Sequence, residues 1–511
     1  MSTLDSTILG SVTGGDNQLI TGTVGVAVIL ATTVVYYAIS SKEREHDFPK
    51  LRGIQLYHAW NFFQRRYDFL QSNFKRNFGK SFSFNVLHHN VVALTGEEAR
   101  QAFYSNPHLD LGEGYKILMG AAPRVSNVDM ATEESEDGDR TLFNKVLNKL
   151  LNKARIQDVL PTLLQDIVDK ADRWGNDGAA GRIDPFTEIY GLVFLMTARM
   201  TTCHDLTKNE VDLKKIGDLF LTLQTSATPT SLLLPWFPSP ARKAGRQATT
   251  ELYTMLYGYV ERRKHARPTN DAIDVLIADG ETTQNIMRFV MAMLFVGIIN
   301  TGIISCWMLI DLAIHTEWKE KCKKEIQDLL SRHLDDSLSS VALHEKLRVI
   351  PVSAWEDELP ILEACIRESQ RIVLSNVALR RNIHEEIRIG KQVVKRGDFL
   401  VYSLGDVHLN PEYYPEPHKY DPGRWLRPDP VPDAIYPFLG WGAGRHPCVG
   451  MKVAKLEMKL ILAMFLTRYE FDLVDKDGKF PDPLPVPNRN DVHQARPLGA
   501  TYYFDFKKIV Q

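Results

Sequence analysis

Two long stretches of the chain carry no charged residue, and the residues in and around them lead to different predictions. The first runs from Asn17 to Ser41, and its part from Leu19 to Ile39 is mostly Val, Ile, Ala, Leu and Thr, long enough as a helix to cross a bilayer. No Lys or Arg precedes it, which argues against a cleavable signal peptide. Basic residues follow it: Lys42, Arg44 and Lys50. The positive-inside rule therefore predicts a lumenal segment at 1–18, a transmembrane anchor at 19–41 and a cytosolic body at 42–511, with a buried pair of Val-rich strands as the alternative.

The second stretch, Phe289 to Ile310, has 22 residues without a charge, so its hydropathy alone would allow another membrane span. Its middle, however, contains Asn300, Thr301 and Gly302. Polar groups are costly facing lipid but useful beside a ligand or cofactor. This pattern favours a buried core helix.

Period-two alternation from Ser81 to Leu87, a turn at residues 88–90 and an apolar run from Val91 to Leu94 predict a β-hairpin. A second hairpin is predicted from Ile387 to Tyr402. Most other segments have helical periodicity, and no repeat or long Gly/Ser linker divides the body. The expected fold is therefore mostly α with a minor β component, preceded by one N-terminal transmembrane helix.

Composition narrows the class of protein further. With 44% hydrophobic and 24% charged residues over 511 positions, the chain is typical of a folded enzyme. With a formal net charge of −2, the chain has no overall positive field to attract nucleic acid, so no nucleic-acid partner is expected. Five widely separated cysteines suggest a reducing compartment rather than a disulfide scaffold; they are Cys203, Cys306, Cys322, Cys365 and Cys448. The Pro-broken apolar segment Leu232 to Pro238 is expected either to pack inside or to dip into a membrane surface.

Cys448 stands in a glycine-dense segment, Phe438 to Gly450, followed by a helix with apolar Val453, Leu456, Leu460 and Met464 on one face. Glycines permit tight turns and close backbone approach, and helix N-terminal amides lower a thiol pKa. A thiolate that binds metal or attacks a substrate is the chemistry this pattern favours. A lone cysteine in a turn is otherwise more often a buried structural residue.

The same segment resembles the haem-binding signature of the cytochrome P450 family, Phe-Gly-x-Gly-x-Arg-x-Cys-x-Gly. Gly442, Gly444, Cys448 and Gly450 are in register with it. Trp441 stands where Phe is usual and His446 where Arg is usual, and both keep the physical type: an aromatic against the ring and a donor for a haem propionate. The resemblance implies haem b, iron protoporphyrin IX, with Cys448 as the axial ligand.

Glu368-Ser-Gln-Arg371 resembles the family's Glu-x-x-Arg pair, and Pro417 to Trp425 resembles its Pro-x-x-Phe-x-Pro-x-Arg segment. Alone, the first spacing usually means a solvated surface pair. Together the two segments imply a buried ionic cluster of Glu368, Arg371 and Arg424 that locks the core behind the haem.

Arg381, ten residues after Arg371, is expected by analogy to pair with a haem propionate, with Arg380 as the alternative. The segment Gly297 to Gly302 resembles the family's Ala/Gly-Gly-x-Asp/Glu-Thr element, which implies Thr301 as the proton-relay hydroxyl. Asn300 then replaces the acid, and its amide can orient a relay water. The alternative is that both are satisfied polar residues of a core helix.

The usual third-helix propionate contacts are not recognisable, and Arg140 or Tyr115 could substitute for them. Pocket positions chosen by analogy are Ile298, Asn376, Val377 and the loop from Tyr115 to Pro123.

The resemblance implies a monooxygenase in the endoplasmic reticulum membrane that takes electrons from an NADPH-cytochrome P450 reductase. It would insert one oxygen atom from O2 into a lipophilic molecule of terpenoid, sterol or fatty type, in a fungal specialised pathway. The alternatives are a haem-thiolate isomerase or dehydratase that needs no reductase and O2, and a haem carrier or sensor without turnover.

Overall fold

The computed structural model describes residues 47–118, 124–125, 128–129, 145–334, 341–374, 377–429 and 433–509. The predicted lumenal segment and anchor at 1–41 lie outside these residues, as do Arg140, Asn376 and part of the loop from Tyr115 to Pro123.

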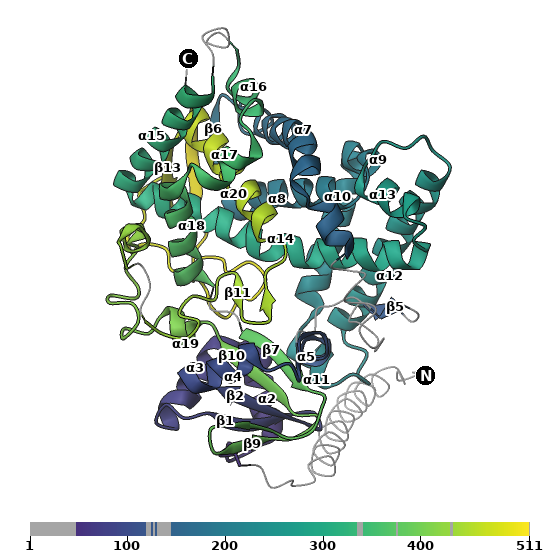
Figure 1. Cartoon of the computed structure of the whole chain (residues 1–511), viewed down its shortest axis with the longest axis vertical. Helices are drawn as coiled ribbons and strands as arrows, with labels where there is room; N and C mark the ends of the chain where they lie inside the picture. The colour runs from purple at the N-terminus through teal and green to yellow at the C-terminus, as the bar shows by residue number, and fades with distance from the viewer. Residues whose placement is uncertain are drawn as a thin grey trace, which may run out of the picture.

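The molecule has a large helical part and a smaller sheet-rich part (Figure 1). The longer helices of the first part are α7 (Lys153–Ala171), α8 (Pro185–Thr201), α10 (Glu210–Ser226), α12 (Pro240–Lys264), α14 (Thr283–Ile314), α15 (Thr316–His333), α18 (Pro360–Val373) and α20 (Met451–Arg468). Short helices join them: α9 (His204–Lys208), α11 (Pro229–Leu233), α13 (Ala272–Ala278), α16 (Leu343–Arg348), α17 (Val352–Asp357) and α19 (Gly405–His408). The mostly α fold with a small β component is as predicted.

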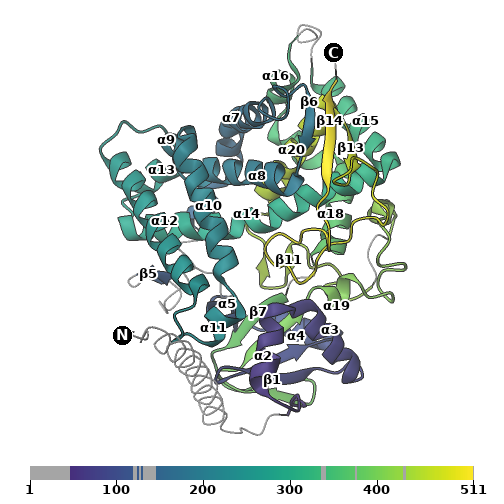
Figure 2. The same ribbon diagram turned by 180° about the vertical axis from the view of Figure 1, so that it is seen from behind.

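Helix α14 crosses the middle of the helical part (Figures 1 and 2). Its N-terminus is capped by the Thr282 side chain, which accepts a hydrogen bond from the Asn285 backbone N–H. Among the described residues it is the one helix long and apolar enough to span a membrane, yet 72% of its most apolar window is buried within the protein. The prediction of a buried core helix is confirmed.

The sheet-rich part contains a five-stranded sheet in the order β1-β2-β10-β7-β3. The strands are β1 (Phe82–Val86), β2 (His89–Leu94), β3 (Leu109–Asp110), β7 (Val377–Asn382) and β10 (Phe399–Ser403). Strands β1 and β2 form the predicted hairpin. Helices α2 (Gln55–Gln64) and α3 (Arg66–Arg76) pack their Phe62 and Phe69 against Phe84 on one face, whereas α4 (Glu97–Ser105) and α5 (Leu111–Leu118) follow in the chain.

The second predicted hairpin is wrong in its extent. Within the described residues, β8 (Ile387–Ile389) pairs with β9 (Gln392–Val394) and with no other strand, turning at Gly390 with φ +58°. β10 instead pairs antiparallel with β7 and parallel with β2. Every residue of β10 is buried, so it is stabilised by a place at the centre of the larger sheet rather than at the edge of a local hairpin.

The remaining strands form small sheets: β13 (Tyr469–Val474), β14 (Tyr503–Lys508) and β6 (Ala180–Ile183); β4 (Arg124–Val125) with β5 (Val128–Asp129); and β11 (Gly442–Ala443) with β12 (His446–Pro447). In both views the β11 loop lies between the level of α14 and the five-stranded sheet (Figures 1 and 2).

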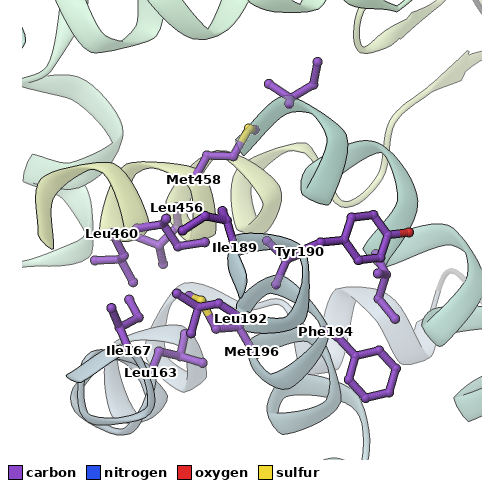
Figure 3. Close-up of a cluster of buried hydrophobic side chains, with 14 of the residues drawn as sticks. Leu163, Ile167, Ile189, Tyr190, Leu192, Phe194, Met196, Leu456, Met458 and Leu460 are labelled. Atoms are coloured by element: carbon purple, nitrogen blue, oxygen red, sulfur yellow. The ribbon is translucent and has the colours of Figure 1, made fainter. Parts of the chain in front are cut away.

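Helix α20 begins directly after the Cys448 loop. It is buried on all sides from Leu456 to Thr467, not on one face as its apolar spacing predicts. Figure 3 shows part of this packing, in which Leu456 and Leu460 lie in one cluster with Leu163 of α7 and Ile189 of α8, and helices α14, α15 and α17 also pack against α20. The loop therefore ends in a helix anchored by the main core.

Candidate active site

The backbone of the Cys448 loop can be built only with glycine at two positions. Gly442 and Gly444 have φ values of +71° and +58°. A Cβ at Gly442 would lie 2.5 Å from the His446 carbonyl oxygen, and one at Gly444 would lie 2.2 Å from the Tyr104 carbonyl oxygen. The loop thus folds back on itself between β11 and β12 and packs against the end of α4, where Arg445 N–H donates to Tyr104 O at 3.0 Å.

Cys448 is held by this turn, with its N–H donating to the Trp441 carbonyl at 2.7 Å, and its side chain is exposed. The surrounding protein nevertheless raises the pKa of the Cys448 thiol above its ordinary value, and the backbone N–H of Gly450 offsets this only in part. The amide contribution thus has the predicted sign, but burial of the thiol outweighs it. The other four cysteines are buried.

Trp441 and His446, the two departures from the family signature, are both half-buried beside Cys448. Trp441 Nε1 is buried and has no hydrogen-bond partner among the described residues. Its ring lies 5.4 Å from Lys455 Nζ. Gly450 directly precedes α20 and serves as its N-cap residue.

Glu368, Arg371 and Arg424 are brought together in the interior. Glu368 accepts from Arg371 Nε and Nη2 at 3.0 and 2.8 Å and from Arg424 Nε at 3.0 Å. It also accepts from Trp425 Nε1 at 2.9 Å and from the Asp421 backbone N–H at 3.1 Å. The carboxylate is fully buried, so this geometry supplies the charge and hydrogen bonds that a buried ion needs.

The cluster connects to the cysteine loop through His408, a residue that the sequence analysis missed. Arg371 Nη1 donates to the His408 carbonyl at 2.8 Å, and His408 Nε2 accepts from the Leu439 N–H at 2.9 Å. Burial lowers the pKa of His408 to about 3, which keeps the ring neutral and able to accept. No local motif marks His408, whereas Trp425 could have been found from its place next to Arg424.

Arg381 does not point toward the Cys448 loop. Its Nη1 donates to Glu113 of α5 at 2.9 Å, and its guanidinium lies over the Phe399 ring. Its neighbour Arg380 projects to the opposite face of β7, over the rings of Phe103 and Tyr104. Because Tyr104 contacts the cysteine loop directly, Arg380 is the arginine on the loop side of the strand.

In α14, Asn300 is exposed and Thr301 is buried at 6%. Thr301 makes no hydrogen bond within the described part of the chain, unlike Thr201, whose hydroxyl donates to the Thr197 carbonyl at 2.7 Å. Of the expected pocket positions, Ile298 and Val377 are buried. Sequence analysis did not single out Val296 of α14, whose side chain is 63% exposed although the helix crosses the interior.

An exposed thiol at the end of a loop that only glycines allow is the arrangement of a protein whose chemistry centres on that cysteine, and comparison with known proteins identifies the family. Residues 52–491 match the model of the family described as Cytochrome P450. The chain belongs to the cytochrome P450 family, which implies a cysteine-ligated haem, and it is an oxidoreductase of the monooxygenase type.

Fungal monooxygenases are among its relatives. It is 30% identical to cytochrome P450 monooxygenase nsrP of Aspergillus novofumigatus over 80% of this chain and 79% of that protein. It is 26% identical to cytochrome P450 monooxygenase AacuE of Aspergillus aculeatus, over 90% and 93% of the two chains. The solved structure of retinoic acid-bound cyanobacterial CYP120A1 shares the fold, with a TM-score of 0.68, 20% identity and coverage of 91% of this chain and 100% of that one.

Proposed function

We propose that Cys448 is the axial ligand of haem b in a monooxygenase that oxidises a lipophilic small molecule. The observation that supports this most strongly is the exposed thiol at the end of a loop whose backbone only glycines allow. The overall reaction consumes the substrate RH, O2, two electrons and two protons, and yields ROH and water. The bound haem supplies the oxygen activation, with the thiolate donating electron density to iron.

The residues around Cys448 fit an iron porphyrin. The Gly450 N–H reaches the sulfur, and Trp441 offers an aromatic ring whose buried Nε1 lacks a partner in the described structure. His446 and Arg380 are the donors proposed for the porphyrin carboxylates, because Arg380 lies on the loop side of β7 whereas Arg381 pairs with Glu113. The polar residues of α14 expected on the oxygen side are the adjacent Asn300 and Thr301, which differ in exposure and so need not both face the porphyrin.

The ionic cluster acts as structural support for this site. Glu368, Arg371 and Arg424 hold α18 against the 3₁₀ turn η2 (Pro422–Leu426), and through His408 they position Leu439 at the start of the cysteine loop. Their role is to position Cys448, not to touch the substrate.

Membrane attachment is part of the proposal. Besides the predicted anchor at 19–41, α2 and the α11 loop share one apolar cluster through Phe62 and Leu233. Three large apolar side chains nearby are exposed: Ile54, Tyr57 and Trp236. Such side chains suit the cytosolic face of the endoplasmic reticulum membrane, where a lipophilic substrate of terpenoid, sterol or fatty type would be concentrated.

The electron donor proposed is an NADPH-cytochrome P450 reductase. Basic residues lie at the outer side of the cysteine loop, with Arg445 and Lys452 both exposed. An acidic partner surface would be attracted to this region, close to the sulfur.

The test is the absorption spectrum of the reduced protein under carbon monoxide. The wild type should show the strongly red-shifted Soret band of a thiolate-ligated haem, and Cys448→Ala should lose it. Cys203→Ala, which removes a distant buried thiol, should keep it. A wild type that purifies folded and haem-loaded without this band would refute the assignment.

A second candidate, a haem-thiolate isomerase or dehydratase, is favoured by one observation: the exposed residue Asn300 is an amide and not an acid. Product formation from candidate lipids that requires neither reductase nor O2 would select it. Dependence on NADPH, reductase and O2 selects the monooxygenase.

A further inference from the structure

Asn300 and Thr301 are adjacent in α14, so their side chains point about 100° apart around the helix. One residue therefore faces the loop of Cys448 better than the other. The contacts of the glycines and of Asp311 in the same helix decide which.

Thr301 faces α8. A Cβ at Gly297 would lie 2.8 Å from Thr197 Cγ2, and one at Gly302 would lie 2.6 Å from Tyr190 Cδ2, and both of these partners belong to α8. At about 100° per residue, Thr301 falls between the directions of Gly297 and Gly302. Its low exposure agrees with a place in the contact between the two helices.

Asn300 lies on the side of α14 that contacts α18 about three turns further along the helix. Asp311 follows it by eleven residues, which at about 100° per residue brings the two within roughly 20° of the same face. Asp311 Oδ2 accepts from the Ser369 hydroxyl of α18 at 2.6 Å. The next residue of α18, Gln370, has its Oε1 3.0 Å from where a Cβ of Gly440 would lie, in the cysteine loop. Around Asn300 this side of α14 is open, since Val296, one turn before it, is 63% exposed, whereas Asp311 is covered by α18.

We propose that Asn300, and not Thr301, is the residue of α14 that faces the haem and handles the protons of the reaction; this rests on the haem-thiolate function proposed above. The amide binds a water molecule, with Nδ2 donating and Oδ1 accepting. Protons come from solvent, pass through that water, and leave the amide unchanged, because an amide does not ionise in this range. Val296 beside it limits the size of the group that approaches.

The first experiment measures the infrared C–O stretch of the carbon monoxide complex, which reports a hydrogen-bond donor on the α14 side without needing the substrate. Asn300→Leu removes the amide at similar volume and should move the stretch to higher wavenumber. Thr301→Val, the matched isosteric change, should leave it where the wild type has it. A shift in Thr301→Val with none in Asn300→Leu would overturn the proposal.

The second experiment uses 4-phenylimidazole, a nitrogen ligand of ferric haem, followed by its difference spectrum. Asn300→Phe should weaken binding by about tenfold or more, because the added ring fills the space in front of the iron. Thr301→Val should bind as the wild type does. Unchanged affinity in Asn300→Phe would contradict the proposed orientation. A wild type without the red-shifted carbon monoxide band would instead refute the haem-thiolate function itself, so the two failures are distinguishable.

Discussion

On one side of the proposed haem site a loop places Cys448 through its backbone, and on the other a helix presents Asn300 and Thr301 through side chains alone. In the loop, Gly442 and Gly444 have positive φ values and no room for a Cβ. Each glycine can therefore be matched to only one position of the loop. In α14 every residue has ordinary helical geometry, and a shift of one residue leaves the helix intact while rotating the chemistry by about 100°.

This difference shows where a sequence motif can assign a role to one particular residue. The loop is specified by steric exclusion, whereas the helix register is specified by contacts with α8 and α18 that lie far away in the chain. Variants in the two regions, and in the cluster that supports the loop, test the comparison.

The largest effect is expected from Glu368→Gln. It leaves Arg371 and Arg424 buried without their counter-charge, which costs about 3–5 kcal/mol of unfolding free energy. Because His408 links this cluster to Leu439, the haem content should fall as well. Denaturant unfolding and the haem-to-protein absorbance ratio measure the two consequences.

The matched control is Asp218→Asn, which breaks the exposed pair with Lys214 and should change stability by about 0.5 kcal/mol or less. If Glu368→Gln behaved like this surface variant, the loop would be stabilised by its own backbone and not by the cluster.

Local patterns account for what the sequence predicted correctly. The β1–β2 hairpin and the burial of α14 follow from alternation and from a charge-free run with a polar centre. The extent of the second hairpin was wrong because β10 is paired with β2, which lies far back in the chain. For the same reason the partner of Arg381, Glu113 on α5, could not be foreseen.

The site shows the same division. The glycines around Cys448 mark the loop in the sequence, whereas neither the direction of Asn300 nor the link through His408 has a local signal. Both depend on which helices and loops pack together, which a single sequence does not state.

An intermediate effect is expected from the Asp311 contact that sets the orientation of α14. Burial raises the pKa of Asp311 from 3.8 to about 7, while the Ser369 hydroxyl opposes the rise. The folded protein therefore keeps a proton that the unfolded chain loses near pH 3.8. The contribution of this group to the unfolding free energy is greatest below pH 3.8. It declines by up to about 4 kcal/mol in all as the pH rises to about 7, and it is constant above that pH.

Asp311→Asn should remove this part of the pH dependence. As the pH rises toward 7, the unfolding free energy of the wild type should therefore fall relative to that of the variant. Unfolding by urea at pH 5, 6, 7 and 8 measures the slope. An unchanged slope would mean that Asp311 is not held neutral in the α14–α18 contact.

The smallest effect, and the most direct test of the loop, compares two alanine substitutions at glycines with positive φ. Gly79 has φ +70° and nothing within 4 Å of its Cβ position, so Gly79→Ala loses only the left-handed backbone preference, about 1 kcal/mol. Gly444→Ala adds a clash with Tyr104 O and should cost about 2–3 kcal/mol in total. The clash also pushes the loop away from α4, so Gly444→Ala should weaken the carbon monoxide band while Gly79→Ala leaves it intact. Equal losses of stability in the two variants would show that backbone preference, and not steric exclusion, specifies the cysteine side of the site, and the contrast with α14 would then fail.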